Sequence, residues 1–114
     1  MSNTNRTYNP VQKLTVQAKE DIPEHRFVDH SGNLCGVADK SFGVSEIEWL
    51  NNQYISLITL GTAIIETDSA VNIGDPITSS TDGKAKVATG SDSINGRALD
   101  TVGVAGYIRV MLIQ

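Results

Sequence analysis

The chain has 114 residues, of which 39% are hydrophobic, 5% are aromatic and 19% are charged, and its formal net charge is −4. This length predicts one domain with a modest core that needs neither a metal nor a disulfide, and a single cysteine, Cys35, excludes an internal disulfide. The acidic balance without a basic cluster argues against a nucleic-acid-binding surface, and the longest apolar stretch, residues 55–65, is too short to cross a membrane.

The N-terminal residues 1–12 are polar and rich in asparagine, with Tyr8 and Pro10 as the bulky and rigid members. They lack the apolar segment of a signal peptide, so we expect no export through the general secretory route. Such a segment cannot bury enough apolar surface to fold alone. We therefore expect a flexible N-terminal arm, either a free tail or a segment that orders against a partner, followed by a single all-β domain over residues 13–114.

Short strands and turns are predicted along this domain. Residues 13–18 alternate apolar and polar side chains, which is the period of a half-buried strand. Further strands are predicted at residues 22–28, 34–38, 53–60, 62–66, 76–79, 85–88, 94–99 and 107–113. The Asp82-Gly83 pair predicts a type I′ hairpin turn, because that turn needs positive φ at both central residues.

Residues 45–50 allow two interpretations. Ser45 and Glu48 have the spacing of a capping box, which favours one turn of helix. Ile47 and Trp49 would share one face of a strand, which favours a strand about equally. Trp49 is the one tryptophan of the chain, and it is either a core plug or an interface anchor.

The regular alternation of strands and turns predicts the fold class. About eight to ten short strands, with turns roughly every eight to twelve residues, indicate a small all-β barrel or sandwich. The two halves of the chain also resemble each other, because Tyr54-Ile55 and Tyr107-Ile108 each open an apolar stretch. We therefore predict two pseudo-repeated β units, residues 14–60 and 61–113.

Four potential metal ligands lie close together in the sequence: His25, Asp29, His30 and Cys35. The spacing of the two histidines fits that of zinc ligands. Only one cysteine follows, however, and on a strand the two histidines would face opposite sides of the sheet. Cys35 lies in an apolar run, which predicts a buried and unreactive thiol. We therefore favour a surface hairpin with two histidines over a metal site or a cysteine nucleophile.

The carboxylates of the chain include pairs at Glu20/Asp21, Glu46/Glu48 and Asp92/Asp100. They fall in polar turns or on exposed faces, where nothing would raise a carboxyl pKa for acid–base catalysis. The serine-rich segments lack a nucleophile elbow, and the spaced glycines form no phosphate-binding loop. We therefore predict no catalytic, cofactor-binding or metal-binding residues, and we interpret Asp75 and Asp82 as turn residues.

Four motifs follow one another in the second half of the chain. They are residues 70–77 (AVNIGDPI), 82–85 (DGKA), 94–99 (INGRAL) and 107–112 (YIRVML). In this order they resemble the capsid cement, or head decoration, proteins of tailed bacteriophages. The resemblance covers the second half of the chain well and the first half more loosely. It implies a small β-barrel of the β-tulip or β-clip kind.

The resemblance also implies a function. A cement protein is not an enzyme: it binds the outer surface of an assembled head and stabilises contacts between major capsid protein subunits, commonly as a homotrimer. We accordingly expect a virion protein made in the host cytoplasm, with the major capsid protein and further copies of itself as partners. We expect no cofactor and no binding to nucleic acid or membranes. The arm of such proteins lies on the capsid, so the predicted capsid or subunit contacts are Arg6, Tyr8 and Pro10, together with Trp49.

Two other classes of function stay open. One is a different virion β module, such as a head-fibre base or a glycan-binding adhesin, and an adhesin would need exposed aromatic side chains. The other is an enzyme on a β-clip scaffold, such as a nucleotide hydrolase. That enzyme would need a catalytic acid beside a phosphate-binding segment, which the sequence does not show.

Overall fold

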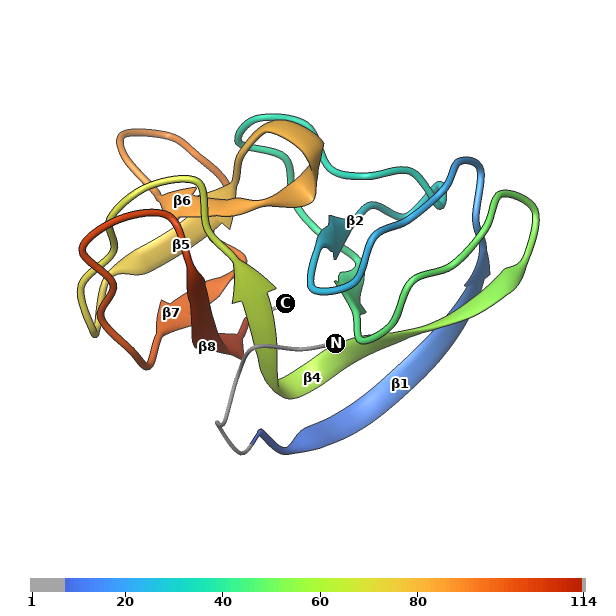
Figure 1. Ribbon diagram of the computed structural model, residues 1–114, viewed down its shortest axis with the longest axis horizontal. Helices are drawn as coiled ribbons and strands as arrows, with labels where there is room; N and C mark the ends of the chain where they lie inside the picture. Colours follow the sequence, from blue (N-terminus) through green and yellow to red (C-terminus); the bar gives the residue numbers. More distant parts are fainter. Residues whose placement is uncertain (1–7, 114) are drawn as a thin grey trace.

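The computed structural model describes residues 8–113, which form antiparallel β-strands joined by turns (Figure 1). In chain order the strands are β1 (Pro10–Gln17), β2 (Phe27–Val28), β3 (Gly43–Ser45), β4 (Tyr54–Glu66), β5 (Pro76–Ser79), β6 (Ala85–Val87), β7 (Gly96–Ala98) and β8 (Tyr107–Leu112). One turn of 3₁₀ helix, η1 (Thr81–Gly83), joins β5 to β6. The strand order in the sheet is β2-β3-β4-β8-β7-β5-β6, and β1 also pairs with β4.

Strand β4 connects the two halves of the sheet. Its first half pairs with β1 and β3, and its second half pairs with β8. The prediction of two separate strands here is wrong: Gly61, with φ +99°, bends one continuous strand (Figure 1). An ideal Cβ at this position would lie 2.4 Å from the Asn9 carbonyl oxygen, so the bend requires glycine.

The two outer strands of the sheet, β2 and β6, approach each other and nearly close a barrel. The turn between β5 and β6 lies against β2, because the Gly83 N–H donates to the Cys35 carbonyl at 3.0 Å and the Cys35 N–H donates to the Phe27 carbonyl at 3.1 Å. At the start of β6, Ala85 forms a parallel bridge with Thr67, just after β4. The predicted all-β fold is therefore confirmed, in the form of a small, nearly closed antiparallel barrel.

The turn that closes the barrel has the predicted geometry. Asp82 and Gly83 have φ of +59° and +74°, which are the two positive values that a type I′ turn needs. The Lys84 N–H donates to the Thr81 carbonyl across the turn at 3.4 Å. The Asp82-Gly83 turn predicted from the sequence is thus confirmed.

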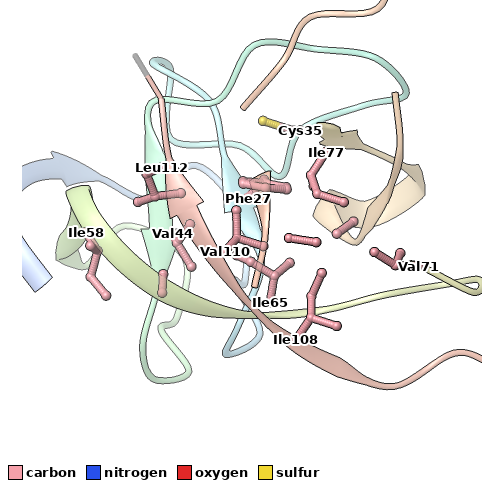
Figure 2. Packing of buried hydrophobic residues seen from close by; sticks show 13 residues of the cluster. Phe27, Cys35, Val44, Ile58, Ile65, Val71, Ile77, Ile108, Val110 and Leu112 are labelled. Carbon is pink, nitrogen blue, oxygen red and sulfur yellow. The ribbon is translucent and has the colours of Figure 1, made fainter. Parts of the chain in front are cut away.

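Two clusters of buried apolar side chains form the core. The main cluster lies inside the barrel, where its side chains point toward one another (Figure 2). Phe27 is the one aromatic residue among its buried members. The second cluster consists of Ala18, Ile22, Val28, Ile55 and Leu57. Most members of both clusters are small or β-branched, and such side chains fill the narrow space between closely packed strands.

Two strands predicted in the first half are corrected by the structure. Of residues 22–28, only Phe27–Val28 forms a strand, because His25 has φ +60° and turns the chain. Residues 34–38 form no strand, because Ala38 also has a positive φ, of +64°. Each segment contributes buried side chains to the core, namely Ile22, Phe27 and Val28 in the first and Cys35 in the second, but burial alone does not require an extended ladder.

Residues 45–50 form neither a helix nor a regular strand. Ser45 ends β3, and Trp49 makes an isolated antiparallel bridge with Ile22 through two N–H···O bonds of 2.8 and 2.9 Å.

The other predicted strands are present, with shifted ends in most cases. In particular, β1 begins at Pro10 rather than at Lys13. Tyr54 and Tyr107 begin β4 and β8, whereas the pseudo-repeat of residues 14–60 and 61–113 stays a prediction.

Candidate functional site

Tyr8, a predicted capsid contact, is held by the barrel itself. Its ring packs against the main core cluster. Its hydroxyl donates to Glu46 Oε2 at 3.0 Å, and the Lys13 ammonium lies 2.6 Å from Glu46 Oε1. Burial and the bond to Glu46 raise the pKa of the Tyr8 hydroxyl, so it stays protonated and keeps donating. Tyr8 thus fixes the start of β1 to the connection after β3, and its contact with a capsid stays a prediction.

The other predicted contact residues occupy different environments. Arg6 lies outside the described residues. Pro10 is exposed at the start of β1, opposite Gly61. Trp49 is partly buried against the second core cluster, and its indole Nε1 is buried without a hydrogen-bond partner within residues 8–113. Trp49 therefore occupies the position of a core plug, one of the two roles left open by the sequence.

His25 is a buried titratable group of the barrel. Its side chain is packed edge-on against the Tyr107 ring, with the ring centroids 5.6 Å apart, and the residue is 4% exposed. Its Nε2 lies 3.0 Å from Glu24 Oε2. Burial lowers the pKa of His25, and the carboxylates of Glu24, Glu66 and Glu46 oppose this shift only in part. The imidazole is therefore neutral near pH 7.

The four potential metal ligands do not assemble into a site. No group of three or more histidine, cysteine, aspartate or glutamate side chains is placed to hold a metal in the described part of the chain. His30 instead packs on the Phe42 ring, with centroids 4.8 Å apart. Cys35 is buried, and burial raises the pKa of its thiol to about 12, which confirms the predicted buried thiol.

A polar network spans the line along which the barrel closes. Arg26 donates through Nη2 to Glu66 Oε1 at 2.9 Å and through Nη1 to the Asp82 carbonyl at 3.1 Å. The Lys84 ammonium lies 3.8 Å from Glu66 Oε2. We call Arg26, Glu66, Asp82 and Lys84 the seam. Its groups join the residue before β2, the end of β4 and the β5–β6 turn, and this role is structural.

Several aspartates stabilise turns and ends of strands. Asp75 Oδ2 accepts the Asn72 N–H at 3.0 Å, so Asp75 lies in a turn as predicted. Asp100 accepts two bonds from the Arg109 guanidinium, at 2.9 and 3.0 Å, which raise the pKa of Arg109. These carboxylates already have partners within the fold, and their contacts explain their positions without catalysis.

The sequence did not predict a face that forms around the Ile22–Trp49 bridge. We call it the acidic ladder face, and its members are Glu20, Asp21, Glu24, Ile47, Glu48 and Leu50. Antiparallel pairing of Ile22 with Trp49 places Asp21 opposite Leu50, and Asp21 Oδ1 accepts the N–H of Asn51 at 2.9 Å. Ile47 and Leu50 are 56% and 57% exposed. Acidic and exposed apolar side chains therefore alternate along the two segments that this bridge joins.

The two segments of this face are distant in the sequence, and this is why the pattern was missed. Each segment alone contains ordinary exposed acids beside one or two apolar residues. The signal that does exist is local: Ile47 and Leu50 flank Trp49 in a segment without any lysine or arginine. Only the bridge to Ile22 brings the acids of residues 20–24 beside it.

No helix within residues 8–113 is both long enough and apolar enough to cross a membrane.

No protein-family model matches the chain, and no curated protein matches it. Among solved structures, the N base of the head fibre protein gp8.5 of bacteriophage phi29 is similar, with a TM-score of 0.76 and 14% sequence identity. The similar region covers 90% of this chain and 93% of that one. At this identity the likeness shows a common fold, so the chain has the barrel fold of a phage head fibre base.

Proposed function

We propose that the chain is a non-enzymatic structural protein of a phage virion, attached to the outer surface of the head as the base of a head fibre is. The observation that carries this proposal is the fold match to the phi29 base, which spans nearly the whole of both chains. A match of this extent concerns a complete barrel with its connections rather than a common hairpin. The seam and the turn aspartates support a structural role, because the polar groups of each bind other groups of the same fold.

A decoration or cement role is the second candidate, and the order of the GDPI, DGKA and closing-strand motifs supports it. In that role the chain binds the major capsid protein, as homotrimers on the lattice. Many copies, each with a moderate interface, stabilise a head through avidity rather than through one strong contact. The adhesin alternative is less well supported, because Trp49 packs against the core and Tyr54, which is 72% exposed, is the one exposed tyrosine or tryptophan within residues 8–113.

The experiment uses heads of the phage that encodes the chain, assembled without it. Purified protein is added, and the heads are sedimented and imaged by cryo-electron microscopy. We expect co-sedimentation and new density on the outer surface. Binding that also raises the temperature of head rupture supports the cement role, whereas binding without such protection supports the fibre base. Failure to bind intact heads would overturn both.

A further inference from the structure

We propose that the acidic ladder face is the docking surface of this protein, and that its partner is a positively charged protein surface that presents an apolar side chain. The inference rests on the proposed function, because we assign that basic surface to the phage head. It adds which face of the barrel is turned toward the head and which chemistry the head must offer there.

The first argument is the distribution of charge. The face carries four carboxylates, those of Glu20, Asp21, Glu24 and Glu48, and none of them pairs with a lysine or arginine within residues 8–113. The chain has 13 acidic residues in all, so nine remain elsewhere, and these equal the nine lysines and arginines. The four carboxylates of the face therefore equal in number the excess of acidic over basic residues in the chain, and carboxylates without a lysine or arginine partner create a local field that attracts a basic surface.

The second argument is the apolar content of the same face. Ile47 and Leu50 each leave more than half of their surface in water, and carboxylates flank both. An apolar centre with a charged rim is the arrangement found in protein–protein interfaces, where the centre supplies affinity and the rim supplies orientation. Acids needed only for solubility would not require exposed isoleucine and leucine between them.

The third argument is rigidity. The Ile22–Trp49 bridge has two hydrogen bonds, and the Leu50 N–H donates to Gln53 Oε1 at 2.7 Å. Ile22 and Trp49 also pack into the second core cluster directly beneath the face. The loops therefore hold their conformation before a partner arrives, and binding loses little conformational entropy.

The charge also selects the partner. A second copy docked through the same face would set carboxylates against carboxylates, because a two-fold interface uses one patch twice. Nucleic acid and anionic lipid carry the same sign and are repelled as well. A basic protein surface is the partner that both the charge and the apolar centre favour.

The test compares the double variant Ile47→Ser/Leu50→Ser with the matched control Val104→Ser, which removes an apolar side chain that is 74% exposed on another loop. A second pair, Glu48→Gln and Asp92→Asn, removes one carboxylate on the face and one away from it. Affinity for heads assembled without the protein is measured by sedimentation at low and high salt. Thermal melting of each variant shows whether the barrel stays folded.

We expect the double variant to raise the Kd at least about tenfold with an unchanged melting temperature, because central apolar anchors carry most of the energy of an interface. Val104→Ser and Asp92→Asn should bind like the wild type, and Glu48→Gln should weaken the salt dependence of binding. Wild-type binding that the double variant fully retains would overturn this inference alone. Absence of wild-type binding would overturn the proposed function together with it. Loss of association between copies, with head binding intact, would assign the face to self-contact and refute the proposal.

Discussion

Substitution of Gly83 by alanine tests the closure of the barrel. The residue has φ +74°, a conformation that costs an L-residue about 1–2 kcal/mol. An ideal Cβ would also lie 2.4 Å from the Phe27 carbonyl oxygen. That oxygen cannot move away freely, because it accepts the Cys35 N–H at 3.1 Å. Overpacking of this kind adds about 1–3 kcal/mol, so Gly83→Ala should lower the free energy of unfolding by about 2–5 kcal/mol.

Two other glycines separate these contributions. Gly74 has φ +89° but no atom within 4 Å of an ideal Cβ, so Gly74→Ala should cost only the conformational part, about 1–2 kcal/mol. Gly103 has neither a positive φ nor a close neighbour, and Gly103→Ala should stabilise by up to about 1 kcal/mol, because it restricts the unfolded chain.

Urea denaturation followed by circular dichroism measures all three variants, with the slope of free energy against urea as a check on the unfolded state. The predicted order of stability is Gly103→Ala, then Gly74→Ala, then Gly83→Ala. Equal losses at Gly74 and Gly83 would refute the close approach of the β5–β6 turn to β2.

Three further predictions concern polar groups. Since the pKa of His25 is lowered by burial, the unfolded chain binds the extra proton more readily. The stability that the neutral His25 side chain contributes is therefore present above the pKa of about 6.5 that it has in the unfolded chain. This stability is lost as the pH falls toward the lower pKa of His25 in the folded protein. His25→Asn should reduce the change in the free energy of unfolding between pH 7 and pH 5. A change as large as that of the wild type would contradict the lowered pKa of His25. Tyr8→Phe removes the bond to Glu46 and should cost about 0.5–1.5 kcal/mol in urea unfolding; a neutral result would show that the hydroxyl does not hold β1. Asn95 is buried, accepts the Ser41 N–H at 2.9 Å and donates to the Asp39 carbonyl at 3.0 Å. Asn95→Ala should therefore cost about 2–4 kcal/mol, and a loss below about 1 kcal/mol would contradict the buried pairing.

Those features of the fold that depend on local chemistry could be predicted from the sequence. Asp82-Gly83 requires positive φ at two successive residues, and few structures besides a hairpin turn satisfy it. The alternation in residues 13–18 likewise predicts the strand β1, but the half-buried face that it predicts is wrong, because Leu14 is 41% exposed and no residue of β1 is buried.

Features that depend on distant partners could not be predicted. Gly61 has the local character of a break, and only the change of partner from β1 to β8 turns it into a bend within one strand. Residues 34–38 are apolar, yet they contain the buried Cys35 beside the exposed Val37, and the apolar run alone cannot distinguish such a loop from a strand.

In the candidate site, too, local features could be predicted from the sequence and contacts between distant residues could not. The sequence identified Tyr8 and Trp49 as noteworthy aromatic residues, but their partners follow from the tertiary structure. Tyr8 contacts Glu46, 38 residues further along the chain, and Trp49 pairs with Ile22. The acidic ladder face exists only because that pairing joins two segments, each of which is unremarkable alone.

Cryo-electron microscopy of virions, purified from the encoding phage with and without the gene, tests the central claim most directly. The account predicts additional density on the outer surface of the head, into which the barrel fits with the acidic ladder face turned toward the capsid. Identical heads in the two preparations, or density confined to the tail, would contradict it.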